Sequence, residues 1–311
     1  MCVAASAASS SRRGRVDCGC YSVSLPRSEL VKGRVMSHVP AASHHSPLTS
    51  RSPESTSRLR RPPIPAIAVF ARAPVAGHAK TRLIPRLGPQ GSARFQAALI
   101  SDTLRKVAVL RRCVQPYLFL AASPIPFRRS HAEAILYEQP LASAGICEFS
   151  VIRQQGRDLG ERLENAFRRL LRFHPSCVVI GTDSPLFPAR ILRQALGELR
   201  ACESVLGPCP DGGYYLIALR RPVDPGRLRS IFRRVRWSTA FAFSDTLRNL
   251  LRQGLSCSVL EACADVDSPR DLQRLKEDLF LNWKARRLAP ATWNFLNSNA
   301  QIQSHGCVPT R

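Results

Sequence analysis

The sequence has no long apolar run, no Cys-x-x-Cys pair and no internal repeat. Without a run of about 18 apolar residues there is no candidate membrane-spanning helix, and without paired cysteines a zinc ribbon is not expected. Aromatic residues make up only 7% of the chain, and the basic residues behind its net charge of +24 are spread widely instead of forming one stripe. We therefore expect no dedicated nucleic-acid binding. These absences predict a soluble intracellular protein, cytoplasmic unless its leader directs it to an organelle.

Acidic residues are scarce from residue 1 to about 63, where only Asp17, Glu29 and Glu54 interrupt a composition of Ser, Ala, Arg and Pro. This leader has no sustained period and is predicted to be disordered. Its Arg-rich, Ser-rich and acid-poor composition is typical of organellar transit peptides. An overextended start, with Met36 as the true initiator, explains the composition equally well. Both alternatives stay open.

Apolar strand-like runs alternate with helical periods from Pro65 to about Leu279. This alternation predicts an α/β fold in which helices cover a mostly parallel sheet, as one domain over residues 64–279. Ser268, a capping residue, and Pro269, at a first-turn position, predict the start of a helix. Beyond Leu279 we expect a C-terminal tail, residues 280–311, without a clear period. The predicted strands are residues 67–70, 117–121, 148–152, 177–180, 214–219 and 257–260.

A basic loop, residues 71–83, follows the first predicted strand. Backbone amides freed at its Pro and Gly residues, together with Lys80 and Arg82, are suited to an anionic ligand. A P-loop is excluded because Ala79 and Pro74 occupy the positions where that motif requires glycine. The loop therefore indicates a different phosphate site, with a solvated basic turn as the alternative.

Carboxylates follow three other predicted strands or turns. Asp183 ends the run after 177–180, Asp211 precedes two glycines, and Asp265 and Asp267 precede the helix start at Ser268. Each of them would serve equally well to cap a helix or close a turn. Together with the basic loop they predict oxygen ligands for Mg²⁺ or Mn²⁺ and cations for phosphate, as phosphoryl or glycosyl transfer requires.

The order of these motifs resembles one family. The matching segments are residues 70–83, Asp158-Leu159-Gly160-Glu161-Arg162, 181–185, 207–215, Trp237-Ser238-Thr239 and 265–272. They resemble the DUF2064 proteins, which are glycosyltransferase-like transferases associated with radical-SAM/selenodomain clusters. Those proteins belong to the nucleotide-diphospho-sugar transferase superfamily and are similar to 2-phospholactate guanylyltransferases. The resemblance covers about residues 64–279 and implies a GT-A-like fold, a Rossmann-related αβα sandwich.

The resemblance also implies roles for individual residues. Lys80 and Arg82 would meet phosphates, and Lys80 and Asp183 would be catalytic. The metal would be bound by Asp183, with Asp211 and Asp267 as candidate partners. Residues 237–239 would line the pocket in a less defined role. The nucleotide would be bound by Arg72, Gly77, Lys80, Thr81, Arg82, Arg162, Asp211, Gly212 and Gly213.

The chain departs from the family pattern at two places. Arg72 stands where a Lys is usual, and the glycosyltransferase D-x-D is reduced to Thr182-Asp183-Ser184, so metal binding would need a distant acid. We expect a metal-dependent transferase with a nucleoside triphosphate or nucleotide-sugar donor and an unidentified small-molecule or phosphorylated acceptor. Nucleotidyl and glycosyl transfer both stay open. The alternative is a non-catalytic nucleotide-binding or scaffolding protein that retains the fold.

Overall fold

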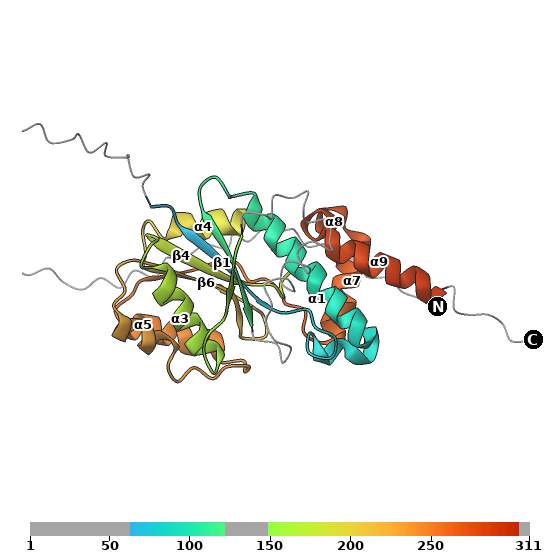
Figure 1. Cartoon of the computed structure of the whole chain (residues 1–311), viewed down its shortest axis with the longest axis horizontal. Helices are drawn as coiled ribbons and strands as arrows, with labels where there is room; N and C mark the ends of the chain where they lie inside the picture. Colours follow the sequence, from blue (N-terminus) through green and yellow to red (C-terminus); the bar gives the residue numbers. More distant parts are fainter. Residues whose placement is uncertain (1–62, 122–148, 305–311) are drawn as a thin grey trace, which may run out of the picture. The chain divides into compact units, whose positions relative to one another are not determined.

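The computed structural model of the 311-residue chain describes residues 63–121 and 149–304 (Figure 1). All of these belong to one compact unit, Leu59–Arg311. The predicted leader lies outside the described residues except for Pro63, as does Glu148 at the start of the third predicted strand. Among the helices of the described part, none is both long and apolar enough to cross a membrane.

A seven-stranded sheet forms the centre of the described part, in the order β3-β2-β1-β4-β6-β5-β7. Every neighbouring pair is parallel except the two that involve β6, which runs antiparallel to both β4 and β5. The mostly parallel sheet expected from the sequence is therefore confirmed. The strands are β1 (Ala66–Arg72), β2 (Gln115–Ala121), β3 (Ser150–Arg153), β4 (Ser176–Gly181), β5 (Ser204–Pro208), β6 (Tyr214–Arg220) and β7 (Cys257–Val259).

Helices cover both faces of the sheet (Figure 1). Side chains alternate across a strand, so β1 supplies Ile67 and Val69 to a core shared with α1 and α4, and Ala68 and Phe70 to a core shared with α3, α5 and α6. This alternation produces the αβα sandwich. The helices are η1 (Thr81–Leu83), α1 (Ile84–Ala108, kinked at Gly88), α3 (Leu159–Leu170), α4 (Arg190–Glu198), α5 (Pro225–Phe232), α6 (Ala242–Arg252), α7 (Pro269–Leu281), α8 (Trp283–Leu288) and α9 (Pro290–Ser304).

The predicted strands are all present, and their ends shift by no more than two residues. The sequence did not predict β5, whose five residues include only two large apolar ones, Val205 and Leu206. The helix start at Ser268 is confirmed as a capping box, in which the Ser268 side chain and the Asp271 side chain each bond the other's backbone N–H. Pro188 precedes the N-cap of α4, Ala189, and so lies outside that helix.

The segment after Leu279, for which the sequence shows no clear period, is largely helical. Residues 283–288 and 290–304 are helical, and Ala285, Ala289 and Phe295 pack with Phe95 of α1 in a third apolar core. These helices leave no single period in the sequence because α8 is only six residues long and Pro290 starts a new helix directly after it. Their packing extends the folded unit beyond residue 279.

Candidate functional site

The candidate site lies where β1 and β4 end. These two strands are parallel neighbours, so their carboxyl ends open at the same edge of the sheet. The chain leaves β1 into the basic loop and leaves β4 into the corner that holds Asp183. The segment before α7 joins them, because the Val266 backbone N–H donates to the Asp183 carbonyl at 2.9 Å. Three segments far apart in the sequence therefore meet at one edge.

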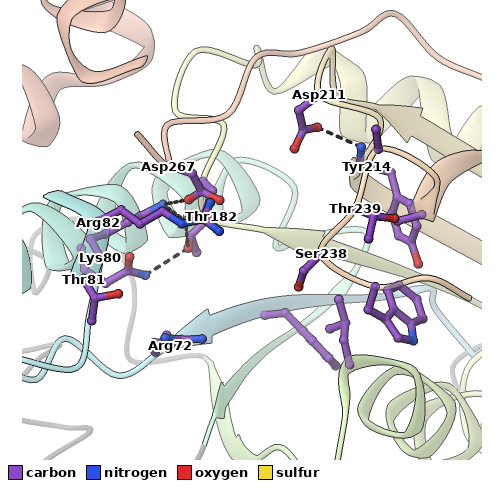
Figure 2. A pocket seen from close by; sticks show the side chains of 18 residues that line it. Arg72, Lys80, Thr81, Arg82, Thr182, Asp211, Tyr214, Ser238, Thr239 and Asp267 are labelled. Carbon is purple, nitrogen blue, oxygen red and sulfur yellow. Dashed lines mark hydrogen bonds and ion pairs between the residues drawn. The ribbon is translucent and has the colours of Figure 1, made fainter. Parts of the chain in front are cut away.

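Lys80 lies at the centre of this meeting point (Figure 2). Its ammonium nitrogen is 2.6 Å from Asp183 Oδ1, 2.8 Å from Asp267 Oδ1 and 2.8 Å from the Val266 carbonyl oxygen. Only 6% of the Lys80 side chain is exposed, whereas 46% of each carboxylate side chain is. Burial alone would lower the pKa of Lys80, but the Asp183 and Asp267 carboxylates outweigh burial and raise that pKa. Lys80 is therefore charged at neutral pH.

The contacts of Lys80 differ from those that a phosphate-binding lysine would make. An ammonium group has three N–H donors, and here three acceptors surround it. To contact a phosphate directly, Lys80 would have to exchange one of these acceptors. Lys80 also has a left-handed backbone conformation, with φ of 45°, which is strained for a residue other than glycine.

A cavity of about 620 Å³ opens beside this cluster. Arg72, Thr81 and Arg82 lie at the same end as Lys80, and Tyr214, Ser238 and Thr239 lie at the other (Figure 2). One end is thus cationic and the other partly aromatic. The lining residues are Phe70, Arg72, Lys80, Thr81, Arg82, Gln96, Leu159, Thr182, Asp183, Asp211, Gly213, Tyr214, Trp237, Ser238, Thr239, Ala240, Ala242 and Asp267.

Most residues predicted for the site line this cavity, but three do not. Gly77 is exposed on the basic loop, and Arg162 donates from Nε to the Gly156 carbonyl at 3.2 Å. Gly212 lies behind the cavity wall in the turn between β5 and β6, where its φ is +88° and a Cβ atom would overlap the Ala240 carbonyl oxygen. Glycine is required there because the turn between β5 and β6 lies directly against the backbone of Ala240.

The partly aromatic end of the cavity is fixed by an ion pair behind it. Arg236 donates from Nε and Nη2 to the two carboxylate oxygens of Asp245, at 2.8 and 2.9 Å. The Asp245 carboxylate also accepts the backbone N–H of Arg236 at 3.1 Å. This bidentate pair secures the turn that presents Trp237 and Ser238 to the cavity.

The three carboxylates predicted to bind one metal fall into two groups. Asp183 and Asp267 share the Lys80 ammonium. Asp211 lies apart from them (Figure 2), and among the described residues the group with metal-ligand spacing that contains it is Cys209, Asp211 and Asp265. Burial, aided by Asp211 and then Asp267, raises the pKa of Asp265 to about 6. The metal roles of all three predicted carboxylates stay predictions.

Gln96 is a lining residue that the sequence did not reveal. It lies on α1 with 2% of its surface exposed, and its Nε2 donates to the Thr182 hydroxyl at 3.2 Å. The hydrogen bond connects α1 to the end of β4. An amide within a helical period was the only available signal, and such a residue is more often structural.

Comparison with known proteins gives one family and several similar structures. The family model described as "Uncharacterized protein conserved in bacteria (DUF2064)" matches residues 108–239. A "putative nucleotide-diphospho-sugar transferase" from Desulfovibrio desulfuricans G20 is 27% identical, with a TM-score of 0.64 over 76% of this chain and 96% of that one. No curated protein matches the chain.

Two further structures are more distant. Rv0371c from Mycobacterium tuberculosis H37Rv is 19% identical with a TM-score of 0.43, over 69% of this chain and 98% of that one. A cytidylyltransferase from Leptospira borgpetersenii is 14% identical with a TM-score of 0.45, over 79% and 99%. The fold expected from the sequence is confirmed by the Desulfovibrio structure, and the resemblance to the DUF2064 family is confirmed over residues 108–239.

Proposed function

We propose that the protein is a transferase that takes its donor group from a nucleoside triphosphate or a nucleotide sugar. The observation that carries this proposal is the buried Lys80 ammonium joining Asp183 and Asp267 at the mouth of a cavity that Arg72 and Arg82 also line. The name of the Desulfovibrio protein supports the same class of donor. A cavity of about 620 Å³ is large enough to enclose a nucleotide-sized ligand.

The donor set at Asp183 and Asp267 fits Mg²⁺ or Mn²⁺. Both residues offer carboxylate oxygens, which these hard cations prefer, and each carboxylate uses only one oxygen on Lys80. Both side chains are half-exposed and line the cavity. When bound, the divalent ion would neutralise charge on the diphosphate of the donor.

The protein's own residues would divide the remaining work. Lys80 would hold the two carboxylates side by side, since its ammonium bonds both of them. Arg82 is exposed at the cationic end and would bind donor phosphate, while Trp237 and Tyr214 would pack against the base or sugar. Catalysis would then come mainly from positioning and from charge stabilisation.

Two reactions are compatible with this arrangement. In nucleotidyl transfer, an acceptor oxygen attacks the α-phosphorus of a nucleoside triphosphate and pyrophosphate leaves. In glycosyl transfer, an acceptor hydroxyl attacks the anomeric carbon of a nucleotide sugar and a nucleoside diphosphate leaves. Both reactions need cations at a diphosphate leaving group, so both stay within the proposal.

Calorimetry would test the proposal with the four common nucleoside triphosphates and a panel of nucleotide sugars, each with and without Mg²⁺. We expect Mg²⁺-dependent binding of at least one donor. The Asp183→Asn variant should bind that donor at least tenfold more weakly, which corresponds to a loss of about 1.4 kcal/mol or more of binding free energy. Asp278→Asn is the matched control because Asp278 is exposed on α7 and does not line this cavity. Binding of no donor would contradict the proposal, and binding without turnover would favour a non-catalytic nucleotide-binding protein.

A further inference from the structure

A second cluster of metal-ligating side chains lies beside the Lys80 site. The Cys209 thiol and one carboxylate oxygen each of Asp211 and Asp265 all lie within 4.8 Å of one another. The cluster does not include Lys80, Asp183 or Asp267. It combines a sulfur with two oxygens, so its chemistry differs from that of the all-oxygen pair.

The backbone sets the positions of these three residues. In the turn between β5 and β6, the Cys209 N–H donates to the Gly213 carbonyl at 2.9 Å, and the Gly213 N–H donates to Asp211 Oδ1 at 2.9 Å. The Cys263 N–H donates to the Pro208 carbonyl at 3.0 Å and brings the segment that holds Asp265 against this turn. The cluster therefore lies on two hydrogen-bonded segments rather than on free loops.

A buried hydroxyl points to a ligand at the same place. Ser184 is only 3% exposed, and its Oγ has no hydrogen-bond partner that meets normal geometry among the described residues. This hydroxyl lies next to the Cys209 thiol. A buried polar atom without a partner is costly, so its place beside the Cys209 thiol calls for an explanation.

The cluster also carries negative charge without a compensating cation. Neither Asp211 nor Asp265 forms an ion pair with a residue in the described part of the chain, and Cys209 is 7% exposed. The Lys80 ammonium is already used by the other two carboxylates. A bound cation would neutralise the two carboxylates and would accept a lone pair from the Ser184 hydroxyl oxygen.

We propose that Cys209, Asp211 and Asp265 form a site for a thiophilic divalent cation, with Zn²⁺ as the best fit, and that Ser184 completes its coordination. Zinc binds cysteine sulfur at about 2.3 Å and carboxylate oxygen at about 2.0–2.2 Å, so tetrahedral ligands lie roughly 3.5 Å apart. Small rotations of the side chains bring ligand atoms within 4.8 Å of one another to that spacing. Mg²⁺ is disfavoured because it requires oxygen ligands.

The proposed ion would join the turn between β5 and β6 to the segment before α7. On binding, the Cys209 thiol would release its proton to solvent and bind as the thiolate. The ion would hold Asp211 on one side of the cavity and Asp265 near Asp267. It would thereby act as a structural clip between the two segments. This proposal goes beyond the proposed function, because the clip would form whether or not the cavity binds a nucleotide.

Cobalt would test this site in the full-length protein. Co²⁺ replaces Zn²⁺ in sites of this kind, and a coordinated thiolate produces near-ultraviolet charge-transfer absorption that oxygen ligands do not. We expect this absorption on titration with Co²⁺ alone, its loss on addition of Zn²⁺, and its loss in Cys209→Ser. Asp265→Asn should weaken Zn²⁺ binding at least tenfold, about 1.4 kcal/mol in binding free energy.

Matched variants separate this site from other cysteines and from the Lys80 site. The absorption should survive in Cys263→Ser, Cys113→Ser and Asp183→Asn, each checked for folding by circular dichroism. Absence of the absorption in the wild-type protein, or its survival in Cys209→Ser, would overturn the proposal. Loss of donor binding in the calorimetric test would leave this result unaffected, so the two proposals fail separately.

Discussion

Lys80 Nζ lies 2.6 Å from Asp183 Oδ1 and so joins the loop after β1 to the corner after β4. The same nitrogen reaches Asp267, which is 187 residues further along the chain. One buried cation therefore lies between the two carboxylates whose other oxygens a divalent ion would bind. Lys80 and the ion are both positive and would bind the same two carboxylates, so they compete for the same negative charge.

Lys80→Met should raise the affinity of the protein for Mn²⁺ while lowering any transferase activity. The substitution removes a positive charge beside two half-exposed carboxylates, which water can solvate, so the fold should persist. We expect about a tenfold gain in Mn²⁺ affinity, a small part of the Coulomb energy of a charge pair at this distance. Electron paramagnetic resonance of free Mn²⁺ would measure it, with the exposed Lys276→Met as control. An unchanged or weaker Mn²⁺ affinity would show that Lys80 does not compete with the ion.

Arg82→Gln should weaken donor binding without changing stability. Arg82 is exposed on η1, lines the cationic end of the cavity and has no ion pair among the described residues. A charge-assisted hydrogen bond to phosphate contributes about 1.5–3 kcal/mol, so we expect roughly ten- to hundredfold weaker binding. Arg86→Gln is the control because Arg86 is exposed nearby but does not line the cavity. Equal affinities of both variants in calorimetry would remove Arg82 from the donor site.

Gly212→Ala should destabilise the protein and weaken donor binding. The residue has a φ of +88°, and an added Cβ would overlap the backbone of Ala240, which lines the cavity. Strain of this kind costs about 1–3 kcal/mol, before any displacement of the turn is counted. Gly197→Ala is the matched control, because a Cβ there meets no atom within 4 Å and alanine favours the helix. Similar urea midpoints for the two variants would contradict this role for Gly212.

The sequence predicted those parts of the fold whose signal is local. β1 and β4 are mostly apolar because both faces of each strand are buried over most of their length, and the Ser268 cap uses neighbouring residues. β5 was missed because a five-residue strand ending in Gly and Pro has almost no pattern of its own. It becomes a strand through its pairing with β6 and β7.

The sequence was less informative about the site. The topology rule for parallel strands brought Lys80 and Asp183 to one edge, as expected. No local pattern shows that an ammonium group will bond two carboxylates and a carbonyl supplied by distant segments. For the same reason Asp211 seemed to belong with Asp183, whereas the turn between β5 and β6 places it with Cys209. Such pairings depend on tertiary packing, which the spacing of residues along the sequence does not determine.

Lys106 gives the protein a pH dependence that a single substitution should remove. Its side chain is 6% exposed, donates to the Pro185 carbonyl and lies 4.4 Å from the centre of the Phe187 ring. Burial, opposed by Asp102 and Cys263, lowers the pKa of Lys106 to about 8. Between that value and the ordinary pKa of 10.5 the unfolded chain binds more protons than the folded one, so stability from this group rises with pH.

The free energy of unfolding of wild type minus that of Lys106→Met should therefore increase by about 3 kcal/mol between pH 7 and 11. Urea unfolding at several pH values would measure the difference, and the exposed Lys276→Met should show no such rise. A difference that stays constant or falls with pH would show that Lys106 keeps its proton in the folded protein.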